Sequence, residues 1–233
     1  MKNKRIAIMQ PGYFPWLGFF ELMYKCDFFV FLDDVQYTRR DWRNRNRLRS
    51  SDGWQWITVP VFSKDHSNIM IKDIIINNTV NWKKKHLNII KINYVKAKFF
   101  NDYYKELESL LSCEWKNLSE LAIYSTLFLR DKLGIKTPCM RSSSLNIKER
   151  KSNKILKICQ AMGADELFDT KASRNFLDKT LFKRGNIKII FQNYGHPAYQ
   201  QVQKPFLEYM SALDLLINCG SQSLEVILGQ QNN

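Results

Sequence analysis

Residues 5–37 have the sequence RIAIMQPGYFPWLGFFELMYKCDFFVFLDDVQY, which follows a strand, loop, helix, strand pattern. Residues 5–9 are rich in β-forming side chains, and residues 28–32 are a continuous apolar run of strand length. Such runs are typical of strands that are covered on both faces, and residues 16–25 between them suit a helix. This βαβ unit predicts two parallel strands and an α/β fold.

The predicted fold class is α/β, with an N-terminal Rossmann-like parallel sheet within residues 1–100 and a largely helical part in residues 101–233. The two regions can form one continuous domain. Residues 54–62 and 69–76 predict further strands, and residues 81–94 predict a helix. The start of the chain has the layout of a nucleotidylyltransferase, but the H-x-G-H signature of those enzymes is absent.

The composition excludes a disordered tail and indicates anionic partners. The chain has 233 residues, of which 45% are apolar, enough to bury a substantial core. It carries 36 Lys and Arg against 22 Asp and Glu, a formal net charge of +14. A positive excess of this size favours nucleotides, phosphosugars, nucleic acids, acidic proteins or membrane surfaces as partners.

Several classes of protein are disfavoured by what the sequence lacks. The apolar runs are far shorter than the roughly 20 residues that span a bilayer, so we expect no membrane span. Five cysteines without a C-x-x-C pair predict no zinc site and no disulfide framework, which favours a cytoplasmic protein. No Walker A, G-x-G-x-x-G, G-x-S-x-G or H-E-x-x-H motif is present, and we expect no metal.

Polar and aromatic side chains follow each of the first two predicted strands. The carboxyl ends of parallel strands meet at one edge of a sheet, where ligands of open α/β sheets bind. We therefore expect the loops at residues 10–16 and 33–37 to face each other. Their candidate binding residues are Gln10, Tyr13, Trp16, Asp33, Gln36 and Tyr37.

Residues 38–51 contain six arginines, with Trp42, Asn44 and Asn46 interleaved. Arginine forks suit phosphates, so this segment can bind a diphosphate. An arginine-rich run with an aromatic residue also suits RNA, and most charge runs are simply solvated faces. The candidate binding residues of this segment are Trp42, Arg43, Asn44, Arg45 and Asn46.

Three further residues are candidates for acid–base chemistry or substrate binding. Asp34 follows a buried strand and can act as a general base, or pair with the arginines downstream. His86 has an intrinsic pKa suited to taking a proton from an amine, although a lone histidine is more often structural. His196 lies in an aromatic loop and is a candidate substrate-binding residue.

Four segments closely resemble the WbqC-like family. Their sequences are QPGYFPWLGFF at residues 10–20, DFFVFLDDVQY at 27–37, WRNRNR at 42–47 and WITVPV at 56–61. The likeness extends over nearly the whole chain and includes the stretches around His86 and His196. Residues 169–172 depart from it, since a loop richer in Ser and Gly is expected there.

The resemblance implies a bacterial protein of O-antigen or surface polysaccharide biosynthesis. It implies an N-acyltransferase that moves an aminoacyl group, such as glycyl, from a carrier-protein thioester to a nucleotide-linked amino-dideoxy sugar. The partners would be a nucleotide diphosphate sugar and an acidic carrier protein, for which a basic surface is suited. We expect no tightly bound cofactor, the donor being a thioester on a phosphopantetheine arm. The alternatives are other sugar-nucleotide chemistry, such as nucleotidyl transfer, and an RNA-binding module.

Overall fold

In a computed structural model, which describes residues 3–39, 41–62 and 69–229, five parallel strands form one sheet. The strands are β1 (Arg5–Met9), β2 (Phe28–Phe31), β5 (Cys139–Arg141), β6 (Glu166–Asp169) and β7 (Lys188–Phe191), in the order β5-β2-β1-β6-β7. The predicted α/β class and the parallel pairing of the first two strands are confirmed.

The order of the strands reverses at β1. The chain runs from β1 to β2 and β5 on one side, and then places β6 and β7 on the other. Ala7 of β1 pairs with Phe29 of β2 and with Phe168 of β6. The carboxyl ends of β1 and β6 therefore flank the topological switch point, the usual place for a ligand in an open α/β sheet.

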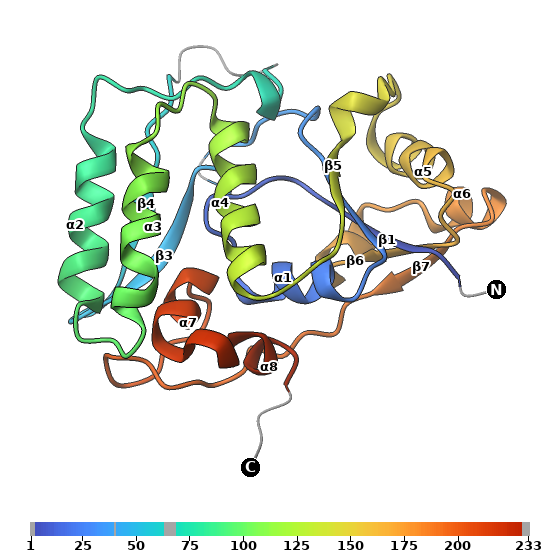
Figure 1. Cartoon of the computed structure of the whole chain (residues 1–233). Helices are drawn as coiled ribbons and strands as arrows, with labels where there is room; N and C mark the ends of the chain where they lie inside the picture. Colours follow the sequence, from blue (N-terminus) through green and yellow to red (C-terminus); the bar gives the residue numbers. More distant parts are fainter. Residues whose placement is uncertain (1–2, 40, 63–68, 230–233) are drawn as a thin grey trace.

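Helices cover both faces of the sheet, as the apolar run in β2 predicts. Ile6 and Ile8 of β1 pack in a core with α5 (Lys151–Ala161) and α6 (Lys179–Arg184). Ala7 faces a larger core on the opposite side, which includes α1 (Leu17–Tyr24). In Figure 1, α5 and α6 lie to the right of the sheet, while α2 and α3 lie on the far left.

The larger core joins the sheet to a helical part and a hairpin. Its helices are α2 (Trp82–Tyr94), α3 (Phe100–Ser112), α4 (Leu118–Lys132), α7 (Ala212–Cys219) and α8 (Ser223–Ile227). The hairpin consists of β3 (Arg45–Ser50) and β4 (Gly53–Thr58), both in contact with α2. Within the described ranges, no helix has both the length and the apolar character needed to cross a membrane.

Two segments differ from the sequence-based expectation. The strand predicted over residues 69–76 is wrong, because this segment contains the short 3₁₀ helix η2 (Ile71–Asp73) and makes only isolated bridges. Those bridges join Met70, Ile75 and Ile76 to three different partners, so no continuous ladder forms. The predicted strand over residues 54–62 is shorter, as β4, and its partner β3 lies in the arginine-rich segment.

Candidate functional site

The loop at residues 10–16 is fixed in place by buried hydrogen bonds. Phe14 has a φ of 44°, a left-handed conformation that is uncommon for a bulky residue. Its carbonyl accepts from Asn46 Nδ2 and from Ser211 Oγ, each at 2.7 Å. Its N–H donates to Ser125 Oγ at 3.2 Å. Three distant segments therefore hold a strained backbone, which is a feature of ligand-binding loops.

His86 is buried and uses both ring nitrogens. Its Nε2 lies 3.2 Å from the carbonyl oxygen of Thr58, and its Nδ1 lies 3.0 Å from the hydroxyl of Tyr13. A carbonyl can only accept, so Nε2 carries the proton and Nδ1 accepts from Tyr13. Burial, together with Lys85, lowers the pKa of His86 to about 4, although the bond to Thr58 opposes the shift. In this arrangement His86 ties α2 to β4 and to the loop at residues 10–16.

The adjacent acids Asp33 and Asp34 connect the end of β2 to other elements. Asp33 accepts from the N–H of Ser143 at 3.0 Å and from its hydroxyl at 2.9 Å. Asp34 forms a buried salt bridge with Lys154 of α5 at 2.7 Å. The partner of Asp34 is thus a lysine far along the chain rather than the arginines downstream. Its role as a catalytic base stays a prediction.

The hairpin carries its arginines and tryptophans on one face. Arg47 pairs with Trp56 and Arg49 with Trp54 across the two strands. Side chains alternate along a strand, so Asn46 and Ile57 point to the opposite face, where both are buried. We call the exposed side of the hairpin the arginine–tryptophan face; its residues are Trp42, Arg43, Arg45, Arg47, Trp54 and Trp56.

Guanidinium groups stack on indole rings across this face. Arg45 lies 4.2 Å above the ring of Trp56, and Arg47 lies 4.2 Å above that of Trp54. The rings of Trp42 and Trp54 are 39% and 41% exposed, so a planar ligand can reach them. Stacking fixes the guanidinium planes over the rings.

Arg43 and Arg47 have polar atoms that no protein group satisfies. The Nε atom of each is buried and has no hydrogen-bond partner. Burial lowers the pKa of Arg43, while its salt bridge with Asp41, at 3.4 Å between Nη2 and Oδ2, opposes the shift. Native proteins seldom leave buried donors unpaired, and the Nε of the fully buried Arg49 in the same segment is unpartnered as well.

The loop at residues 10–16 adjoins the arginine–tryptophan face. A Cβ atom added at Gly12 would lie 3.3 Å from the carbonyl oxygen of Trp42, so a side chain there would require the backbone of Trp42 to shift by a few tenths of an ångström. Asn46 bonds the same loop from the buried face of β3, while Asn44 bonds Val59 at 2.8 Å. The close approach at Gly12 and the bond from Asn46 therefore place this loop against the arginine-rich segment.

The remaining predicted residues lie around this centre. Trp16 packs against Tyr194, with ring centroids 5.5 Å apart, and His196 follows in the same segment. The Nε2 of His196 accepts the N–H of Tyr209, and burial lowers the pKa of His196. Gln36 is exposed and bridges to Met70, whereas Tyr37 is buried.

Three residues of interest are not among those predicted from sequence: Trp54, Trp56 and Asp169. For the tryptophans a signal exists, because Arg and Trp each recur at every second position on either side of Asp52 and Gly53. Such a turn between alternating segments is typical of a β-hairpin. For Asp169 no local signal exists, since its position beside β1 depends on the order of the strands.

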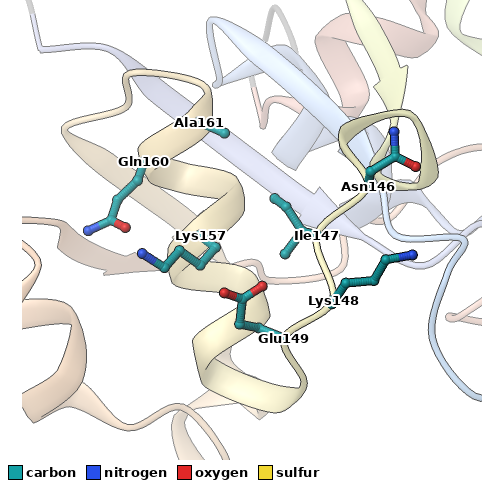
Figure 2. Close-up of a pocket in the computed structure, with 7 residues that line it drawn as sticks. All are labelled: Asn146, Ile147, Lys148, Glu149, Lys157, Gln160 and Ala161. Carbon is teal, nitrogen blue, oxygen red and sulfur yellow. The ribbon is translucent and has the colours of Figure 1, made fainter.

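A surface hollow lies away from these residues. Figure 2 shows it between α5, which contributes Lys157 and Gln160, and the segment that contains Ile147 and Glu149. None of the predicted site residues lines it. Elsewhere in residues 3–39, 41–62 and 69–229, no group of three or more His, Cys, Asp or Glu side chains could hold a metal ion.

The comparisons with known proteins agree with the resemblance seen in the sequence. A family model described as "WbqC-like protein family" matches residues 10–226. A protein of Mycobacterium tuberculosis (strain ATCC 25618 / H37Rv), titled "Uncharacterized protein Rv1507c", is 35% identical over 222 residues, which cover 94% of this chain and 96% of that protein. No solved structure matches the chain.

Proposed function

Since the chain belongs to the WbqC-like protein family, we propose that it binds a nucleotide diphosphate sugar on the arginine–tryptophan face and acylates an amino group of that sugar. The observation that carries the proposal is the stacking of the Arg45 and Arg47 guanidinium groups on the rings of Trp56 and Trp54, beside the partly exposed Trp42. A diphosphate supplies acceptors for the guanidinium groups, and a nucleobase supplies a ring to stack on Trp42 or Trp54.

The acyl donor we propose is a thioester on an acidic carrier protein. Amine attack on a thioester needs positioning, loss of a proton from nitrogen, and donors for the developing oxyanion. The formal charge of +14 favours encounter with an acidic carrier. Cysteine catalysis has little support in the site, because burial raises the pKa of Cys219 to about 11 and that of Cys26 to about 12.

Calorimetry with uridine, thymidine, guanosine and cytidine diphosphates tests the binding step. We expect Arg47→Ala to lower the affinity for whichever diphosphate the wild type binds by roughly 10- to 100-fold, the usual cost of losing a charge-assisted hydrogen bond. Arg184→Ala is the matched control, because Arg184 is an exposed arginine in the last turn of α6. An equal loss in both variants would mean that only general charge attraction was measured.

An RNA-binding module is the competing outcome of the same experiment. RNA bound through many phosphates gives an affinity that falls steeply with salt, whereas a diphosphate releases few counterions. If polyuridylate binds with a steep salt slope, and all the arginines of the segment contribute evenly, the proposal is wrong. Transfer itself is checked by mass spectrometry of a nucleotide-linked amino sugar incubated with a glycyl carrier thioester.

A further inference from the structure

Asp169 stands at the switch point of the sheet. It is the last residue of β6 and follows Phe168, which pairs with Ala7 of β1. Because side chains alternate along a strand, Asp169 lies on the same face of β6 as Leu167, which packs in the core with α5 and α6. Cys159 of α5 is a neighbouring titratable group. Burial, with a contribution from the charge of Asp169, raises the pKa of its thiol to about 12.

Among the described aspartates of low exposure, Asp169 forms no salt bridge, and its hydrogen bonds come from its own turn, from Thr170 and Ser173. Asp34 has Lys154 and Ser142, and Asp33 has Ser142 and Ser143. Asp214 accepts from Tyr94 and Tyr199, each at 2.6 Å, and from Gln201 at 3.0 Å. The Oδ1 atom of Asp169 accepts a hydrogen bond from the N–H of Thr170 at 2.7 Å.

No cation in the described part of the chain offsets the charge of Asp169. Among the residues that the structure describes, no Lys, Arg or His forms a salt bridge with it, although only 9% of its surface is exposed. Burial raises the pKa of Asp169 to about 6, with hydrogen bonds from Thr170 and Ser173 opposing the shift. An under-paired carboxylate of this kind costs stability, which proteins tolerate mainly at functional sites.

Gln10 supplies a second acceptor on the neighbouring strand. It follows β1 directly. By the alternation of side chains along a strand, it lies on the same face as Ile6 and Ile8, which pack in the core shared with α5 and α6. Its Oε1 atom is buried and has no hydrogen-bond partner. Two acceptors at the ends of adjacent strands call for a ligand group that donates several hydrogen bonds, as an ammonium group does.

The same loop connects these acceptors to the arginine–tryptophan face. Gln10 and Gly12 are two residues apart, so their Cα atoms are separated by at most about 7 Å. Gly12 touches the backbone of Trp42. A nucleotide held by the arginines can therefore extend a sugar toward the ends of β1 and β6.

We propose that the carboxyl ends of β1 and β6 bind the ammonium group of the sugar, with Asp169 as its proton acceptor and Gln10 as a second acceptor. The ammonium nitrogen gives one proton to the Asp169 carboxylate and then attacks the thioester carbonyl carbon. The C–N bond forms, the C–S bond breaks, and the second proton from nitrogen neutralises the departing thiolate. Asp169 later releases its proton to solvent. This inference rests on the proposed function for the identity of the ligand.

A stability measurement tests the inference without any ligand. Asp169→Asn removes an ionised, buried and under-paired group, so we expect its thermal midpoint at pH 7.5 to equal or exceed that of the wild type. Asp214→Asn is the matched control, because its carboxylate is fully hydrogen-bonded, and we expect a clear loss of stability. If Asp169→Asn is destabilised like the control, Asp169 has a structural role and the inference is wrong.

A binding comparison tests recognition of the ammonium group. The probes are dTDP-4-amino-4,6-dideoxyglucose and dTDP-glucose, measured by calorimetry at pH 7.5 against wild type and Asp169→Asn. We expect the wild type to bind the amino sugar about tenfold more tightly, and Asp169→Asn to lose that preference while still binding dTDP. Equal affinities in the wild type overturn the inference but leave diphosphate binding intact.

Single-turnover transfer tests whether Asp169 acts as the base in addition to binding the ammonium group. We expect Asp169→Asn to lower the rate about 10²- to 10⁴-fold at saturating sugar. We also expect the wild-type rate to increase as pH rises through about 6, and this increase to be absent in Asp169→Asn. Asp131→Asn, at an exposed acid of α4, should leave both unchanged. A wild-type rate in Asp169→Asn overturns the assignment. If Arg47→Ala weakens diphosphate binding as expected while Asp169→Asn behaves like the wild type, the proposed function holds independently of Asp169.

Discussion

At the scale of single residues, the two candidate bases have partners that give each a structural role. His86 donates to Thr58 and accepts from Tyr13, and Asp34 is paired with Lys154. A base must meet the substrate with a free lone pair, and both groups would first have to give up these partners. Variants at the two positions therefore report on stability before they report on turnover.

His86 should make the stability of the protein depend on pH. Its pKa is about 4 in the folded state and near 6.5 when unfolded, so the unfolded chain binds the extra proton between these values. Stability linked to His86 is therefore present above pH 6.5 and is lost as pH falls toward 4. We expect the difference in unfolding free energy between wild type and His86→Gln to shrink by about 2 kcal/mol from pH 7 to pH 5. Urea denaturation at both pH values measures it, and an unchanged difference would refute the link.

The Asp34–Lys154 salt bridge should contribute far more to the stability of the fold than a surface salt bridge does. Their side chains are 10% and 6% exposed, so Asp34→Asn leaves a buried ammonium group without its counterion. We expect a loss of about 3–5 kcal/mol. Asp131→Asn breaks the exposed pair with Arg130 and should cost at most about 1 kcal/mol. Equal losses in the two denaturation curves would mean that the buried pair is not important for stability.

At the scale of elements, the β3–β4 hairpin is hydrogen-bonded to the loop at residues 10–16. Its buried face holds that loop through Asn46, and its other face presents the stacked arginines. A change in the position of the hairpin relative to this loop should therefore alter ligand binding. The two asparagines of the WRNRNR segment allow this coupling to be measured.

Asn46→Ala and Asn44→Ala form a matched pair. Each removes a buried amide from the hairpin region, so each should lower the unfolding free energy by about 1–3 kcal/mol. Asn46 bonds Phe14, whereas Asn44 bonds Val59 beyond the end of β4. We expect only Asn46→Ala to weaken nucleoside diphosphate binding, as measured by calorimetry. Similar weakening in both variants would show that binding does not depend on the loop at residues 10–16.

At the scale of the whole molecule, one sheet combines strands from distant parts of the chain. β1 and β2 come from the first 31 residues, while β5, β6 and β7 begin after residue 138. The sheet thus spans both regions expected from the sequence. Insertion of β1 between β2 and β6 places the switch point beside Gln10 and Asp169, which are 159 positions apart in the sequence.

The sequence by itself determined the local features of this protein. The apolar run at residues 28–32 predicted a buried parallel strand, because its side chains must be covered on both faces. The family motifs marked the loops at residues 10–16 and 33–37, and the charge indicated an anionic partner. These features depend on neighbouring residues and on composition, which a sequence displays directly.

Only the tertiary structure decided which polar groups are satisfied and which are left for a ligand. Asp34 and Asp169 are both aspartates at strand ends, yet one has a buried lysine partner and the other has none among the described residues. His86 has the intrinsic pKa of a base, but burial and the charge of Lys85 lower that pKa to about 4. Burial and pairing depend on groups that lie 28 to 120 residues away in the sequence, and folding brings them together.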